Sequence, residues 1–314
     1  MDVFEHYDLD GAWARVRLHA HRTPVLTSAS LNSLADAELF FKCENFQRSG
    51  SFKFRGASNS VFALNDADAA RGVATHSSGN HGAALALAAS LRGIPCTVVV
   101  PEGANAQKVA AIERYGATLV RCAPTLEARE TTLARVLESA SAVEVHPYDA
   151  DLTIAGQSTC ARELLEDEPL LDAIIAPIGG GGLWAGTALA AQAHNPAIRL
   201  FAAEPQGASD AFLGFQRGIR VTDYPVATIA DGLRTYVGVR NFAIMGAYAN
   251  AVLLASDVQI IAAMRLIWER LKILVEPSCA VPLAAILRYP EHFCGQRVGV
   301  ILTGGNVDLD QLPW

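Results

Sequence analysis

The chain has 314 residues, of which 51% are hydrophobic and 18% charged, a composition that allows one or two globular domains. The formal net charge is −7 and basic residues do not cluster, which argues against a nucleic-acid-binding surface. Residues 1–18 lack an apolar run, so we expect no secretory signal, and apolar runs elsewhere are too short to span a bilayer. The six cysteines lack the spacing of disulfide or zinc frameworks, and we expect reduced thiols in a cytoplasmic protein.

Short apolar strands alternate with helices along most of the chain. In chain order, the pattern predicts a strand at 38–43, a strand at 73–76, a helix at 83–91, a strand at 96–100, a helix at 107–115 and a strand at 117–121. It then predicts a helix at 156–166, a strand at 173–178, a helix at 183–194, a strand at 200–203, a helix at 257–271 and a strand at 298–302. This alternation predicts an α/β fold with parallel sheets covered by helices on both faces.

The segment after the first strand carries a lysine in an unusual setting. Lys53 lies between two phenylalanines in a stretch rich in small residues. A lysine in a partly apolar pocket has a lowered pKa and becomes a nucleophile for a carbonyl group. The alternative is that the segment is a structural junction and Lys53 a solvated surface charge.

A run of hydroxyl, imidazole, amide and glycine residues at 75–82 lies between a predicted strand and a predicted helix. It contains Ser77, Ser78, Asn80 and His81. Free amides and short hydroxyls at a helix N-terminus attract an anion such as a carboxylate, although an ordinary helix cap would use some of the same residues.

Four consecutive glycines, at 179–182, separate a buried strand from a helix. Without Cβ atoms, several backbone N–H groups can face one phosphate, so the segment predicts a phosphate site. The spacing also satisfies a dinucleotide fingerprint, in which Glu204 would be the ribose-binding acid of an oxidoreductase. Thr303 follows the last strand, in a segment that by itself is typical of a plain turn. In a parallel sheet, however, ligands gather at the carboxyl ends of the strands, so Thr303 would face the same crevice.

Together and in this order, these segments resemble the serine/threonine dehydratase and serine racemase group of fold-type-II pyridoxal-phosphate (PLP) enzymes. The resemblance extends from about residue 27 to residue 309 and is densest at 40–44, 51–57 and 146–157. It implies a fold like the tryptophan synthase β subunit, with two open, mostly parallel sheets flanked by helices. It further implies a large PLP-binding domain at 1–65 and 150–314, a small mobile domain at 66–149 that closes over the substrate, and a homodimer.

The resemblance also implies a role for each matching residue. Lys53 corresponds to the Schiff-base lysine, Phe52 lies against the pyridine ring, Asn80 bonds the ring hydroxyl and Thr303 bonds the ring nitrogen. The implied phosphate cradle is Gly179, Gly180, Gly181 and Gly182, and the implied substrate-carboxylate loop is Ser77, Ser78, Asn80 and His81. A neutral hydroxyl at the ring nitrogen makes the cofactor a weaker electron sink, which favours prompt loss of a β-leaving group over transamination.

The implied reaction is β-elimination from serine, threonine or 3-hydroxyaspartate, giving a 2-oxo acid and ammonia, with Lys53 as general base. Ser78 corresponds to the hydroxyl that faces Lys53 across the substrate, and proton return from Ser78 would give an amino-acid racemase instead. Arg129, together with His76, could meet a β-carboxylate; alternatively Arg129 is a solvated helix charge. A catalytically silent PLP-binding protein is the remaining alternative.

The sequence from Glu204 to Asp210 resembles the divalent-cation loop of serine racemase. The resemblance implies that Glu204 and Asp210 supply carboxylate oxygens and Ala208 a backbone carbonyl, all ligands suited to Mg²⁺ or Ca²⁺. The alternative is that Glu204 ends a strand and Asp210 caps a helix.

Overall fold

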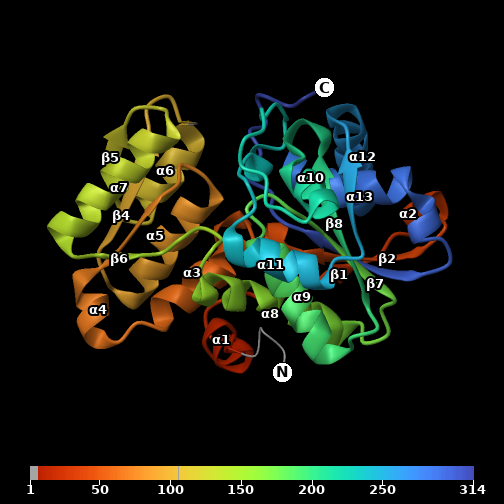
Figure 1. Cartoon of the computed structure of the whole chain (residues 1–314), viewed down its shortest axis with the longest axis horizontal. Coiled ribbons are helices and arrows are strands. Elements are labelled where there is room, and N and C mark those ends of the chain that lie inside the picture. The colour runs from red at the N-terminus through yellow and green to blue at the C-terminus, as the bar shows by residue number, and fades with distance from the viewer. Residues whose placement is uncertain (1–5, 105) are drawn as a thin grey trace.

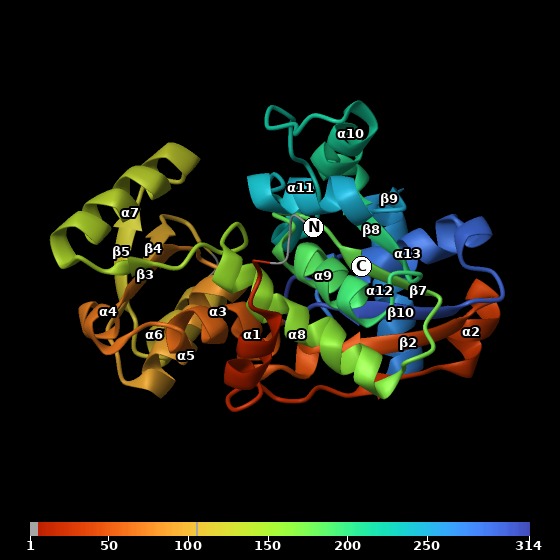
Figure 2. The same cartoon turned by 60° about the horizontal axis from the view of Figure 1, so that its bottom comes forward.

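The computed structural model describes residues 6–104 and 106–314, which form two lobes, each built on one open sheet (Figures 1 and 2). The larger sheet has the strand order β1-β2-β10-β7-β8-β9, and all its neighbours are parallel except β1 and β2. The smaller sheet has the order β5-β4-β3-β6 and is parallel throughout. The strands are β1 Val25–Leu26, β2 Glu38–Cys43, β3 Val73–His76, β4 Cys96–Pro101, β5 Thr118–Cys122, β6 Val143–Glu144, β7 Ala173–Pro177, β8 Arg199–Pro205, β9 Ala251–Ala255 and β10 Arg297–Leu302.

Helices cover both faces of the two sheets, which confirms the predicted fold class. The α-helices are α1 Leu9–Val16, α2 Ala29–Ala35, α3 Lys53–Phe62, α4 Asp66–Arg71, α5 Asn80–Arg92, α6 Ala106–Arg114, α7 Leu126–Ala140, α8 Asp151–Asp167, α9 Gly182–His194, α10 Asp210–Arg217, α11 Val239–Tyr248, α12 Asp257–Leu271 and α13 Pro277–Arg288. The 3₁₀ helices are η1 Glu44–Phe46, η2 Arg48–Gly50, η3 Gln206–Ala208, η4 Asp231–Leu233 and η5 Pro290–His292.

The central strand β7 shows why the large sheet is buried on both faces. Ala173 and Ile175 point into one hydrophobic core, under α2, α12 and α13, whereas Ile174 and Ala176 point into a second core under α8 and α9. Because side chains alternate along a strand, a strand packed between two helical layers must be apolar at every position. This requirement explains the continuous apolar run that predicted the strand.

Helix α3 lies where the two lobes meet. Phe54, Ala57 and Val61 pack into the core of the small lobe. On another side, α3 touches α8 so closely that a Cβ added to Gly156 would lie 2.7 Å from the Cα of Gly56. The sequence did not predict this helix, because its glycine, serine and asparagine residues are poor helix formers; burial of every residue from 54 to 61 compensates for that propensity.

Residues 1–5, part of the segment expected to lack a signal, lie outside the described residues. Across 6–104 and 106–314, no helix has both the length and the apolar character needed to cross a bilayer.

Candidate active site

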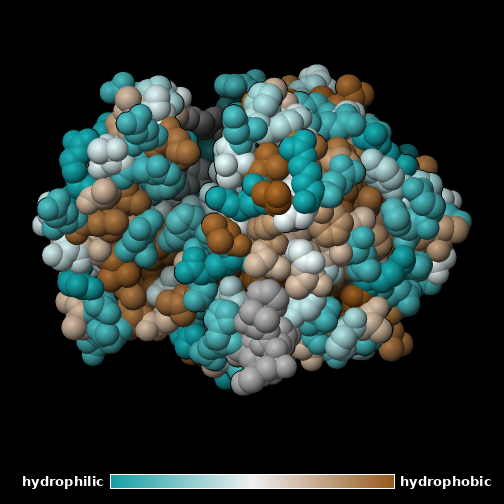
Figure 3. Space-filling model, in the orientation of Figure 1, coloured by the Kyte–Doolittle hydropathy of each residue, from teal (hydrophilic) through white to brown (hydrophobic). Residues whose placement is uncertain are grey.

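All four predicted segments contribute to one pocket between the lobes. Its volume is about 590 Å³, and the molecular surface is hollowed between the lobes (Figure 3). The start of α3, the loop after β3, the loop after β7 and the end of β10 all reach it, because the carboxyl ends of parallel strands converge there. The predicted residues that line the pocket are Phe52, Lys53, Ser77, Ser78, Asn80, His81, Arg129, Gly179, Gly180, Gly181, Gly182 and Thr303.

Lys53 is the first residue of α3 and points its amine into the pocket. Its Nζ donates a hydrogen bond of 2.8 Å to the Pro147 carbonyl and lies 5.1 Å from the centre of the Phe52 ring. Burial lowers the pKa of Lys53 to about 8, against the opposing effect of the negative charge of Glu276. A lowered pKa leaves a larger fraction of the amine unprotonated, as attack on an aldehyde requires.

The loop after β3 holds its amide and imidazole groups through contacts with distant segments. Asn80 donates through Nδ2 to both carboxylate oxygens of Glu276, at 2.9 and 3.2 Å, and accepts a 2.9 Å bond from Asn306. His81 is buried with Nε2 3.0 Å from the Val145 carbonyl oxygen, a contact that places the ring proton on Nε2. Burial lowers the pKa of His81 to about 3, so the ring is neutral.

The glycine loop between β7 and α9 has room only for residues without a side chain. Gly181 has φ +90°, and a Cβ on Gly180 would lie 2.3 Å from Cγ of the Tyr148 ring. Asn241 fixes the loop by donating to the carbonyls of Gly180 at 2.7 Å and Tyr148 at 3.0 Å. The backbone therefore opens towards the pocket at a helix N-terminus, the arrangement that favours a bound phosphate.

Thr303 lies at the end of β10 and is only 4% exposed. Its carbonyl accepts a 3.0 Å bond from the amide of Phe52, which ties the end of β10 to the start of α3. Its hydroxyl is buried and has no hydrogen-bond partner among the described residues. Because buried polar atoms are usually paired, this hydroxyl fits a ligand that supplies the missing partner.

Glu276 is a site residue that sequence reasoning missed. It directly precedes α13, is only 3% exposed and receives the two bonds from Asn80. Burial, followed by the negative charge of Asp231, raises the pKa of Glu276 to about 7. No local pattern marks the residue, since an acidic residue before a helix-starting proline is also an ordinary helix boundary.

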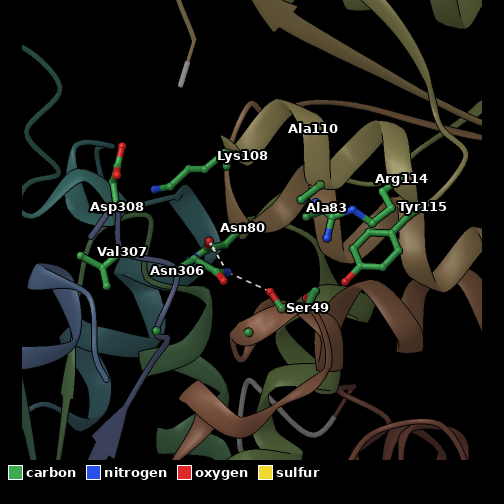
Figure 4. Close-up of a pocket in the computed structure, with 14 residues that line it drawn as sticks. Ser49, Asn80, Ala83, Lys108, Ala110, Arg114, Tyr115, Asn306, Val307 and Asp308 are labelled. Atoms are coloured by element: carbon green, nitrogen blue, oxygen red, sulfur yellow. Dashed lines mark hydrogen bonds between the residues drawn. The ribbon is translucent and has the colours of Figure 1, made fainter. Parts of the chain in front are cut away.

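A second pocket, also of about 590 Å³, lies on the other side of Asn80 (Figure 4). Asn306 donates to Asn80 and to the Ser49 carbonyl at its floor, at 2.9 and 2.8 Å. Lys108 lines both pockets and pairs with Asp231 across the two lobes. The two pockets therefore share a wall whose polar groups are already bonded to each other.

The fit to PLP rests on three observations: a buried lysine with a lowered pKa, a glycine loop that tolerates no side chains, and a buried hydroxyl without a partner among the described residues. A protein-family profile described as "Pyridoxal-phosphate dependent enzyme" matches residues 16–304. The chain belongs to this family. The prediction of a PLP-dependent enzyme is thereby confirmed, and the dinucleotide oxidoreductase alternative is set aside.

Relatives within the family match the chain over nearly its whole length. The chain is 50% identical to the β-hydroxyaspartate dehydratase of Paracoccus denitrificans (strain Pd 1222), covering 100% of both chains. It is 47% identical to the serine racemase of Dictyostelium discoideum, covering 97% of this chain and 95% of the relative. Among solved structures, maize serine racemase superposes with a TM-score of 0.94 at 45% identity, covering 96% of this chain and 93% of that one. The resemblance to fold-type-II PLP enzymes of this group is confirmed.

Arg129, on α7, reaches the same pocket from the small lobe. Its Nε lies 3.4 Å from the Thr125 carbonyl oxygen. Burial, and then the positive charge of Arg129, lowers the pKa of His76. The guanidinium and the imidazole therefore lie near each other on one side of the pocket.

Glu204 and Asp210 lie outside this pocket, at the end of β8 and the start of α10. Glu204 accepts 2.8 Å bonds from the amides of Ala211 and Phe212, and Asp210 accepts a 2.9 Å bond from the amide of Val237. Burial, and then the charge of Asp210, raises the pKa of Glu204 well above its usual range; burial raises the pKa of Asp210 to about 6. Two buried carboxylates that repel each other fit a bound cation. Within the described residues, no group of three His, Cys, Asp or Glu side chains could hold a metal ion.

Proposed function

We propose that the protein is a PLP-dependent dehydratase that converts a small β-hydroxy amino acid to a 2-oxo acid and ammonia. The observation that carries this proposal is the amine of Lys53, with its pKa lowered to about 8, in a pocket it shares with the glycine loop and the unpartnered hydroxyl of Thr303. Similarity to a β-hydroxyaspartate dehydratase across the whole chain supports it.

Different pocket residues would bind different parts of the cofactor. In this proposal, Lys53 is the amine that binds PLP covalently, and the glycines at 179–182 hold its phosphate. Phe52 lies against the ring, Asn80 bonds the ring hydroxyl and Thr303 bonds the ring nitrogen. When bound, the cofactor withdraws electrons from the substrate α-carbon and makes its proton acidic.

Lys53 and Ser78 then decide the fate of that proton. Once the substrate amine has taken its place on the cofactor, the freed Lys53 Nζ would take the proton from one face, and the resulting ammonium would protonate the β-hydroxyl, which leaves as water. The unsaturated amino acid that remains tautomerises and is hydrolysed to a 2-oxo acid and ammonia. The loop of Ser77, Asn80 and His81 holds the substrate carboxylate at the N-terminus of α5.

Replacement of the lysine tests the assignment directly. Lys53→Arg keeps a positive charge but removes the primary amine, so visible absorbance from covalently bound cofactor and release of oxo acid should both disappear. Lys272→Arg changes an exposed lysine in the same way and should leave both unchanged. A Lys53→Arg protein that remains coloured and active would refute the proposal. A wild-type protein that binds PLP but releases no oxo acid from any β-hydroxy amino acid would instead be a silent PLP-binding protein.

Arg129 and His76 favour 3-hydroxyaspartate over serine and threonine as substrate, because a guanidinium is suited to bind a β-carboxylate. Hydrogen bonds to charged groups contribute about 1.5–3 kcal/mol. Arg129→Met should therefore lower kcat/KM for 3-hydroxyaspartate by roughly 10- to 100-fold and change that for serine little. Arg135→Met, at an exposed position on the same helix, is the matched control. Equal losses for both substrates would contradict a contact with the β-carboxylate.

Racemisation is a second candidate activity, favoured by Ser78, which lines the same pocket as Lys53, and by the serine racemase relatives. Proton return from Ser78 to the opposite face would invert the α-carbon. Ser78→Ala should abolish racemisation, measured as chirality of recovered substrate, and spare elimination. The reverse result would reverse the two roles.

Three further features belong to the proposal. Glu204, Asp210 and the Ala208 carbonyl would bind Mg²⁺ or Ca²⁺. A chelator should therefore lower the melting temperature, and Asp210→Asn should remove that response. An unchanged melting temperature would contradict the site.

Residues 66–149 would form a small domain that closes over the substrate. The protein would be a homodimer in the cytoplasm, and light scattering that shows a monomer would refute the assembly.

A further inference from the structure

The turn from β6 to α8 contacts three parts of the candidate active site. The Pro147 carbonyl accepts the 2.8 Å bond from Lys53 Nζ. The Tyr148 ring lies where a Cβ of Gly180 would be. Asp149 accepts 2.9 and 3.0 Å bonds from the amides of Val239 and Arg240, at the start of α11. The turn therefore sets the lysine amine, the glycine loop and α11 relative to one another.

The side chain of His146 bridges the backbone of this turn. His146 Nδ1 accepts hydrogen bonds from two backbone amides, that of Tyr148 at 3.3 Å and that of Asp149 at 2.9 Å. These are the amides two and three residues ahead, which asparagine and aspartate side chains bond in Asx turns and at helix N-caps. The His146 carbonyl accepts a 3.0 Å bond from Thr153 Oγ1, which fixes the residue to α8. His146 itself does not line the pocket.

The bonds require an unprotonated Nδ1, because a protonated imidazole nitrogen donates and cannot accept. Burial lowers the pKa of His146 to about 4, against the opposing negative charge of Asp149 and with smaller contributions from the positive charges of His76, Lys53 and Arg240. Nδ1 is therefore available as an acceptor at neutral pH.

We propose that His146 is a positioning residue, which holds the turn so that the Pro147 carbonyl faces Lys53 and the Tyr148 ring seats the glycine loop. It would act on the lysine and the phosphate site without touching substrate or cofactor. This inference rests on the proposed function for the role of Lys53, but not on which amino acid is the substrate.

A pair of substitutions separates this role from general stability. His146→Leu introduces an apolar side chain of similar size that lacks the acceptor, whereas His146→Asn offers an acceptor to the same two amides. With the PLP-loaded protein, His146→Leu should weaken cofactor retention at least 10-fold and shift the pH midpoint of the visible absorbance. His146→Asn should retain the cofactor within about 3-fold of wild type and keep the wild-type midpoint.

Absorbance is the readout because it does not depend on catalytic turnover. A wild-type midpoint and retention in the Leu variant would overturn the inference. So would an Asn variant as impaired as the Leu variant, and this second outcome remains decisive if His146→Leu does not fold. If wild-type protein binds PLP but is inactive, the proposed function fails, while the comparison of His146→Leu with His146→Asn still tests the positioning role. Loss of visible absorbance in Lys53→Arg tests the role of the lysine separately.

Discussion

Glu276→Gln should make the protein more stable at alkaline pH, and the pH dependence of that gain follows from one buried carboxyl group. Burial raises the pKa of Glu276 from 4.5 to about 7. A difference of that size corresponds to about 3 kcal/mol, at about 1.4 kcal/mol per pH unit. Glutamine keeps the shape of the side chain and one oxygen acceptor for Asn80, so the fold should be retained.

The sign follows from proton linkage. Because the folded state binds the carboxyl proton more tightly than the unfolded state, Glu276 contributes stability that is fully present below pH 4.5. That contribution is lost as the pH rises through about 7. Glutamine has no such proton, so the free energy of unfolding of the variant, relative to wild type, should increase by about 3 kcal/mol between pH 4.5 and pH 8.

Urea unfolding at a series of pH values measures the effect. Glu269→Gln, at an exposed position on α12, removes the same charge and should change stability by less than about 0.5 kcal/mol. Parallel pH profiles for wild type and Glu276→Gln would refute the reasoning, since they would mean that the carboxyl group titrates alike in the folded and unfolded states.

Three other substitutions test separate parts of the site and its support. Gly180→Ala would place a methyl group 2.3 Å from the Tyr148 ring, so it should reduce cofactor bound per chain, and a second change, Tyr148→Ala, should restore it. Thr303→Ala should weaken cofactor retention by about 1 kcal/mol, a few-fold, whereas Thr303→Ser should not. Glu163→Gln breaks buried ion pairs and should cost about 3–5 kcal/mol in urea unfolding, but the same change at the partly exposed Glu166 on α8 should cost less than about 1 kcal/mol.

The sequence was most informative where residues with reactive or hydrogen-bonding side chains follow a recognisable strand. Lys53, the loop of Ser77 to His81, the glycine loop and Thr303 each follow a predicted strand, and parallel strands bring such segments to one edge. Joint occurrence in a fixed order then indicated the family, which the whole-chain comparisons confirm. The individual roles of these residues stay predictions.

Residues that act through distant partners could not be predicted. Glu276 is 196 positions from Asn80, and the turn at Pro147 is 94 positions from Lys53. Arg55, two residues after the lysine, pairs with Glu163 across 108 positions at 2.7 Å in a buried cluster. None of these contacts leaves a periodic or compositional signal, because each depends on how the lobes pack.

The sequence by itself determined the α/β class, the four segments that form the pocket and the membership in a PLP-dependent family. These follow from hydrophobic periodicity and from glycine and hydroxyl residues whose backbone requirements are local. Only the tertiary structure decided which groups set the pKa of Lys53, which carbonyl faces its amine and which carboxylate holds Asn80. Those properties come from burial and from electrostatic contacts between segments far apart in the chain, which exist only once the two lobes are packed together.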